Sequence, residues 1–252
     1  MVMGFDKFRE HFRGFEESYI IIGGSACDWL MDHIQEIPFR ATHDIDLVLC
    51  AEAMTPEFGL AMWKFIRDGG YSVYEKKDGV KQFFRFMNPS TPGYPSQLEF
   101  FAREPIDFKP ADGSTFTPIP LGEDISSLSG ILLDRHYYEF IKSFRRTIDG
   151  VCVLSEEALL ILKARAWKDF TDRKARGDFV KDKDLRKHRL DIVRLQALIP
   201  PGNRVQLSPP LLADFQDFLA AYSLTPTDPS SIGIEGITFD AMIEKLRAIY
   251  AS

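Results

Sequence analysis

The sequence predicts an α+β protein: alternating strands and helices over residues 1–150, then an all-helical region over residues 151–252. Two observations support this prediction. Before residue 102, apolar runs of strand length alternate with segments of helical periodicity, whereas after residue 155 the apolar residues recur with helical spacing alone. The 252 residues are enough for one large domain or two small ones.

The elements of the first region follow from periodicity and from turn residues. Phenylalanines at helical spacing predict a helix over residues 4–17, and the apolar run 19–22 predicts a buried strand. Gly23 and Gly24 end this strand, and Ser25 can cap a helix that reaches about residue 34. Pro56 suits the first position of a helix that runs to residue 67. Further strands are predicted at 44–49 and 98–101, and 71–74 and 80–87 are predicted to pair as a hairpin around Lys77-Asp78-Gly79. A loop or short ribbon is predicted at 105–120.

The second region reads as consecutive helices. Ser155, Glu156 and Glu157 precede an apolar run and form a good helix start. One helix is predicted before the boundary, at 137–144, and four are predicted after it, at 155–172, 182–198, 210–222 and 239–250.

Charge and cysteine content limit the class of protein. The net charge of −6 argues against a generic nucleic-acid binder. Residues 163–194 nevertheless hold twelve Lys and Arg against six Asp, a net of +6 that leaves −12 for the rest. This segment is either a solvated helical surface or a positive wall that faces bound phosphates.

The three cysteines, Cys27, Cys50 and Cys152, are scattered and form no CxxC pair, which argues against disulfides or a zinc site and for a reducing, cytoplasmic location. No apolar run is long enough to span a membrane, and no secretion signal is expected.

Two motifs of the first region suggest chemistry. Gly23, Gly24 and Ser25 would let a ligand approach the backbone closely at a helix N-terminus, where an anion is favoured. The alternative is that the same residues form a plain turn from strand to helix.

Asp44 and Asp46 are two apart in a predicted strand, so both project from one face while Ile45 is buried on the other. Paired carboxylates favour a divalent cation such as magnesium, and an exposed acidic pair on an edge strand is the alternative.

Glu99 is a third candidate carboxylate. It lies within Gln97-Leu98-Glu99-Phe100-Phe101, where an acid is out of place unless it is paired or ligates a metal. With Asp44 and Asp46 it would complete a two-metal cluster that activates a hydroxyl nucleophile. The alternative is an outward-facing residue of an edge strand.

Three residues of the helical region are further candidates. Lys163 lies on the apolar stripe of its predicted helix, where it either snorkels to solvent or points at phosphates. His188 also faces inward, as a core histidine or an accessory residue of the site. Asp191 either pairs with Lys187 one turn away or orients Lys163, His188 or a nucleotide base.

The order of these motifs resembles one family. A Gly-Gly-Ser turn is followed by Arg40-x-Thr42-x-Asp44-Ile45-Asp46-Leu47, an acid-bearing strand, an L-K-A-x-A-W helix and K-H-x-x-D-I-x-R-L. Together they resemble the AbiEii/AbiGii-type nucleotidyltransferases of the DNA polymerase β-like superfamily, which include toxins of type IV toxin–antitoxin systems. The matching segments run from about residue 19 to residue 195.

The resemblance implies a nucleotidyltransferase fold: a short mixed sheet flanked by helices, then a helical domain that closes the active-site cleft. By the same analogy, Gly23, Gly24, Ser25 and Lys163 bind the nucleoside triphosphate (NTP). Magnesium is bound by Asp44 and Asp46, with Glu99 as third ligand, and Asp191 is the distal acid. Many relatives carry an acid where this chain has His188, so the role of His188 stays open.

The reaction implied is attack of an acceptor hydroxyl on the α-phosphorus of an NTP, with release of pyrophosphate. Related toxins modify transfer RNA, so RNA is one candidate acceptor and a cognate antitoxin a candidate partner. Two other functions remain open: a catalytically silent nucleotide-binding or regulatory module, and a nucleotidyltransferase that modifies a small molecule such as an aminoglycoside.

Overall fold

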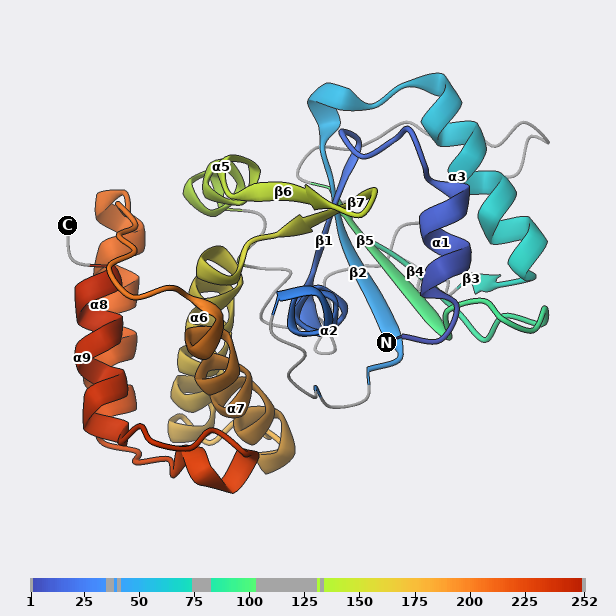
Figure 1. Cartoon of the computed structure of the whole chain (residues 1–252). Helices are drawn as coiled ribbons and strands as arrows, with labels where there is room; N and C mark the ends of the chain where they lie inside the picture. Colours follow the sequence, from blue (N-terminus) through green and yellow to red (C-terminus); the bar gives the residue numbers. More distant parts are fainter. Residues whose placement is uncertain are drawn as a thin grey trace. The chain divides into compact units, whose positions relative to one another are not determined.

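The structure, a computed structural model, describes residues 2–34, 39, 42–73, 83–102, 131 and 134–250 (Figure 1). Backbone contacts divide the chain into two compact units. The first comprises Met1–Leu133 and Ile141–Ser155, and the second comprises Asp134–Phe140 and Glu156–Ser252. The second unit thus includes residues 134–140, which the sequence analysis placed in the first region.

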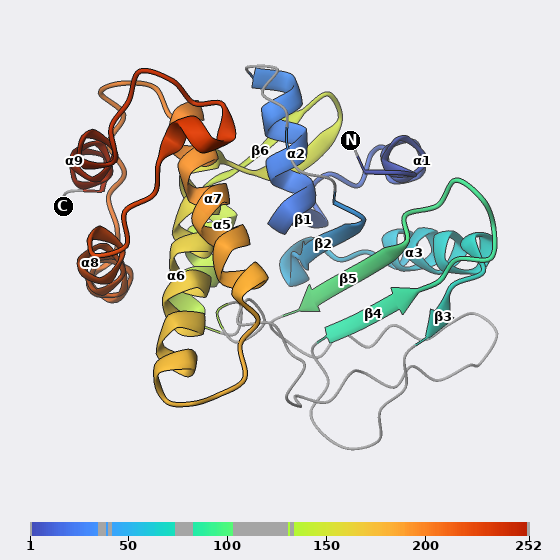
Figure 2. The same ribbon diagram turned by 90° about the horizontal axis from the view of Figure 1, so that it is seen from below.

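A mixed sheet forms the centre of the first unit. Its seven strands among the described residues have the order β3-β4-β5-β2-β1-β7-β6 (Figures 1 and 2). The pairs β1–β7 and β2–β5 are parallel, and the other neighbours are antiparallel. The α+β class and the mixed sheet are therefore confirmed. The strands are β1 Tyr19–Ile22, β2 Asp44–Leu49, β3 Ser72–Val73, β4 Phe83–Met87, β5 Gln97–Ala102, β6 Arg145–Ile148 and β7 Val151–Leu154.

Burial along the strands matches their sequences. All four residues of β1 and of β7 are buried, as expected for apolar strands in the interior of a sheet. In β2, Asp44 and Asp46 are half-buried while Ile45 is fully buried, which confirms the predicted alternation. β5 lies between β4 and β2, so Glu99 is not on an edge strand.

Helices α1 (Phe5–His11), α2 (Gly23–Ile34) and α3 (Pro56–Gly69) belong to the first unit, with the 3₁₀ turn η1 (Ala51–Ala53). Phe8 of α1 and Phe12, the residue after this helix, pack against Phe65 of α3, with ring centroids 5.9 and 5.4 Å apart. The predicted helix over residues 4–17 is shorter, because it ends at residue 11 and Gly14 adopts a left-handed backbone with φ +90°.

In α3 the predicted start at Pro56 is confirmed. The Thr55 hydroxyl accepts a hydrogen bond from the Phe58 N–H at 3.2 Å, Pro56 starts the helix and Gly70 ends it with φ +60°. The predicted antiparallel pairing of 71–74 with 80–87 is confirmed for the described strands β3 and β4. Its turn at Lys77-Asp78-Gly79, the segment 105–120 and the motif residues Arg40 and Ala41 lie outside the described residues.

The second unit is helical. It contains α6 (Glu156–Ala175), α7 (Asp182–Leu198), α8 (Pro209–Ser223), the 3₁₀ turn η2 (Pro229–Ile232) and α9 (Phe239–Ile249), and α5 (Arg135–Ser143) begins in it. Trp167 of α6 makes edge-to-face contacts with Phe218 and Tyr222 of α8 at 5.8 and 5.3 Å. Lys245 of α9 donates to the carbonyls of Gln196 and Ile199 at 2.7 Å and so caps α7. Burial lowers the pKa of Lys245.

The three cysteines are free thiols and are buried. Among the described helices, none has the length and apolar character that a bilayer crossing requires.

Candidate functional site

A row of charged side chains crosses three adjacent strands of the first unit. Asp46 of β2 is the register partner of Glu99 on β5, and Glu99 is the partner of Arg85 on β4. Asp44 lies opposite Gln97 in the neighbouring row. Because cross-strand partners point to the same face of a sheet, Asp44, Asp46 and Glu99 share one face. The structure thus brings the three predicted carboxylates together.

Glu99 has two polar partners on this face. Its Oε1 accepts hydrogen bonds from Arg85 Nε at 2.7 Å and from Gln97 Nε2 at 2.6 Å, and its side chain is 13% exposed. Burial raises the pKa of the Glu99 carboxyl, the Arg85 charge opposes this rise, and the charge of Asp44 adds to it. Glu99 is therefore a paired acid. The sequence analysis missed Arg85, because only the pairing of β4 with β5 brings it to Glu99.

The glycine turn lies against Asp46. Ile22, the last residue of β1, pairs with Asp46, and Gly23 follows it with φ +70° as the first residue of α2. A Cβ on Gly23 would stand 2.1 Å from Asp46 Oδ2 and 3.0 Å from its Cγ. Only glycine fits both this backbone and this contact. The Gly-Gly-Ser turn and Asp46, one of the predicted metal ligands, thus form one local arrangement.

Gly24 and Ser25 lie in the first turn of α2 and are buried. Ser25 was predicted to cap the N-terminus of α2, but the helix already begins at Gly23. The Ser25 hydroxyl instead donates a hydrogen bond to the Ile22 carbonyl at 3.2 Å. The proposed contact of Gly23, Gly24 and Ser25 with a triphosphate stays a prediction.

Replacing Gly23 by alanine is expected to destabilise the protein more than the same change at Gly150. Both glycines have a left-handed backbone, φ +70° and +73°, but a Cβ on Gly150 meets nothing within 4 Å. The strain of the backbone is thus common to both variants, and the clash with Asp46 should add about 1–3 kcal/mol to the loss at Gly23. Urea unfolding measures this difference in the free energy of unfolding. If both variants lose the same amount of stability, the Asp46 side chain does not restrict the space at Gly23.

In the second unit, Lys163 and Asp191 form a buried ion pair. Lys163 Nζ on α6 lies 3.0 Å from Asp191 Oδ2 on α7, and the two side chains are 6% and 0% exposed. Asp191 is therefore placed to orient Lys163, one of the roles that the sequence left open. His188, one turn before Asp191, is half-buried, and its ring centroid lies 5.4 Å from that of Phe170.

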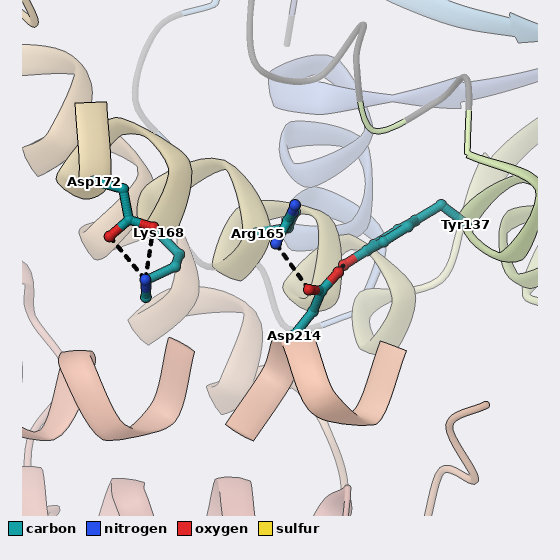
Figure 3. A network of polar contacts seen from close by, with 5 residues as sticks. All are labelled: Tyr137, Arg165, Lys168, Asp172 and Asp214. Carbon is teal, nitrogen blue, oxygen red and sulfur yellow. Dashed lines mark hydrogen bonds and ion pairs between the residues drawn. The ribbon is translucent and has the colours of Figure 1, made fainter. Parts of the chain in front are cut away.

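A network in the same unit uses residues that the sequence analysis did not single out (Figure 3). Arg165 donates to Asp214 Oδ1 at 2.9 Å, and the Tyr137 hydroxyl donates to Asp214 Oδ2 at 3.0 Å, which links α6, α8 and the start of α5. Burial and the charge of Asp214 raise the pKa of Tyr137. Lys168 donates to both carboxylate oxygens of Asp172, at 2.8 and 2.6 Å.

These ion pairs bear on the two interpretations of the positively charged segment 163–194, a solvated helical surface or a wall that faces phosphates. At least six of the segment's twelve cations are paired with acids: Lys163, Arg165, Lys168, Arg173, Lys174 and Arg176. Exposed cations lie at the start of α7, where Lys181, Lys183 and Arg186 follow the exposed ring of Phe179.

The carboxylate face supplies oxygen ligands of the kind that magnesium prefers, from Asp44 and Asp46. Among the described residues, no three His, Cys, Asp or Glu side chains are arranged so that they could hold a metal ion. A two-carboxylate site fits the residues present, while the third carboxylate, Glu99, faces Arg85.

The fold and the site define a two-unit α+β protein whose mixed sheet presents paired aspartates beside a glycine turn at a helix N-terminus. No protein-family model and no curated protein matches the chain. The chain is similar to a solved structure, the crystal structure of an antigenic nucleotidyltransferase-like protein from Paracoccidioides brasiliensis. It is 18% identical, with a TM-score of 0.49, over 98% of this chain and 95% of that one. A likeness at this level does not establish the family, so function is argued from the residues.

Proposed function

We propose that this chain is a magnesium-dependent nucleotidyltransferase. It would transfer a nucleoside monophosphate from an NTP to an acceptor hydroxyl and release pyrophosphate. The observation that best supports this is the contact of Gly23 with Asp46, which puts a helix N-terminus beside the Asp44 and Asp46 carboxylates. An anion and a divalent cation are favoured at these two neighbouring features.

In this proposal each group of the first unit has a distinct task. The N–H groups at the start of α2 bind the triphosphate, and Asp44 and Asp46 hold magnesium. Bound magnesium would neutralise charge on the phosphates. The acceptor oxygen bonds to the α-phosphorus while the bond to the bridging oxygen breaks; pyrophosphate leaves, and the acceptor proton passes to water. Catalysis would come mainly from positioning and charge neutralisation.

Lys163 is proposed, from the family resemblance, to contact the triphosphate. An ammonium group has three donors, so Asp191 can accept one of them while another remains for a phosphate oxygen. Asp191 is fully buried and would act by orienting Lys163. His188 remains an accessory candidate.

The finer assignment, an AbiEii/AbiGii-type enzyme with a cognate antitoxin, is proposed on the order of the sequence motifs. A cytoplasmic location is proposed on the three free, buried thiols. A two-metal site with Glu99 as third ligand stays a prediction, which the metal titration described below tests.

The acceptor is proposed to be RNA. Phe179, in the connection between α6 and α7, is 85% exposed, and the exposed Lys181, Lys183 and Arg186 follow it. An exposed aromatic ring among cations suits single-stranded nucleic acid, because bases stack on the ring while cations meet the phosphates.

Changing Phe179 to alanine should weaken binding of a fluorescein-labelled single-stranded RNA, measured by anisotropy without NTP. Loss of one stacked base costs about 1–3 kcal/mol, or roughly 5- to 150-fold in Kd. Leu224→Ala is the matched control, because Leu224 is a similarly exposed apolar residue of the same unit, and it should leave the Kd unchanged. Binding should also fall steeply with salt. Equal Kd values for both variants would exclude Phe179 as a stacking residue.

The proposed activity is tested by incubating the protein with magnesium, total RNA and each of the four NTPs labelled at the α-phosphate. RNA that becomes labelled by the wild-type protein but not by Asp46→Asn supports the proposal. Label transferred instead to an added aminoglycoside would identify a small-molecule acceptor. Nucleotide binding without any turnover would support the silent binding module.

A further inference from the structure

We propose that Glu99 is the fixed counter-ion of Arg85 rather than a metal ligand, and that the protein itself holds a single divalent ion between Asp44 and Asp46. This inference rests on the proposed function, since it concerns the metal of that site. It assigns Arg85, which no sequence motif singled out, as a positioning residue.

The geometry of the row supports this assignment. Arg85 Nε donates to Glu99 Oε1 at 2.7 Å, and Gln97 Nε2 donates to the same oxygen at 2.6 Å. Arg85 and Glu99 are 25% and 13% exposed, so water screens their attraction only in part. If Glu99 turned to a metal, the Arg85 guanidinium would lose this partner and stand beside a dication. Among the described residues, the hydrogen-bond acceptor of the Arg85 side chain is the Glu99 carboxylate.

The ligands left on this face also suit one ion. With Glu99 bonded to Arg85 and Gln97, Asp44 and Asp46 are, among the described residues, the two acidic side chains that remain as oxygen ligands on this face. In the described part of the chain no three His, Cys, Asp or Glu side chains are arranged to hold a metal ion, which agrees with this assignment.

The test is a titration of the full-length protein with Mn²⁺ alone, in which electron paramagnetic resonance counts the free ion. Wild type is expected to bind one Mn²⁺ per chain. Glu99→Gln should keep that ion with a Kd within about threefold of wild type, whereas Asp46→Asn should weaken it at least tenfold. Arg85→Met should free Glu99 and bring either a second Mn²⁺ or a fivefold or larger gain in affinity.

The double variant Arg85→Met/Glu99→Gln removes the pair without leaving a lone charge, so it should bind Mn²⁺ as wild type does. Circular dichroism checks that each variant is folded. If Glu99→Gln loses Mn²⁺ as fully as Asp46→Asn does, or if wild type binds two ions, this inference is overturned while the proposed metal pair stands. If wild type binds none, the proposed metal site fails, and this inference fails with it.

Discussion

Changing Asp46 to asparagine should reduce nucleotidyl transfer by at least about 10²–10³-fold, the range for losing one fixed group that stabilises charge in a transition state. Asparagine has nearly the same shape, so the contact with Gly23 is kept while the negative charge that would hold magnesium is lost. The measurement is the initial rate of label transfer at saturating NTP and magnesium.

Asp6→Asn is the matched control for this variant. Asp6 lies on α1 in the same unit, its side chain is 73% exposed, and its partner is Arg9 on the same helix. The control should transfer label at the wild-type rate. An Asp46→Asn protein that keeps more than a tenth of the wild-type rate would contradict the assignment of this face as the catalytic site.

Removing either partner of the Lys163–Asp191 pair should lower the free energy of unfolding by about 3–5 kcal/mol, because the remaining charge is buried without its counter-charge. Lys163→Met and Asp191→Leu keep much of the volume, so the loss is mainly electrostatic. The double variant Lys163→Met/Asp191→Leu should be more stable than either single variant, since it leaves neither charge. Urea unfolding of the four proteins measures this coupling.

Lys168→Met serves as the control on the same helix. Lys168 pairs with Asp172, whose side chain is 45% exposed, and such a pair contributes about 0–1 kcal/mol. If the double variant is no more stable than the single variants, the two charges do not depend on each other in the folded protein. Nucleotidyl-transfer assays of the double variant separate the structural role of the ion pair from the proposed contact of Lys163 with the triphosphate. An active double variant would exclude that contact.

Much of the fold could be predicted because its elements have strong local signals. The apolar run of β1, the Thr55-Pro56 start of α3 and the helical periodicity of α6 and α7 each determine an element without help from the rest of the chain. The sequence analysis assigned no strand to residues 145–154. A signal was present there, because Asp149-Gly150 is a typical hairpin turn and both residues have positive φ.

The sheet order was not predictable in the same way, since it depends on contacts between distant segments. Alternation within β2 correctly predicted that Asp44 and Asp46 share a face, because that depends only on the strand itself. The partner of Glu99 depends on the register of β4 against β5 and therefore appeared only in the structure. The sequence likewise named Lys163 and Asp191 separately, and the packing of α6 on α7 joined them.

The position of β7 beside β1 has a consequence for how the chain can be divided and made. The strand Tyr19-Ile20-Ile21-Ile22 obtains its second neighbour from residues 151–154, more than a hundred positions later. A fragment that stopped at residue 140 would carry Asp44 and Asp46, the aspartates proposed to bind magnesium, yet it would present this wholly apolar strand as an open edge. Such edges recruit strands from other molecules. During synthesis the same edge stays uncovered until the Asp149-Gly150 hairpin has left the ribosome, so any shortened version should extend at least through Ser155.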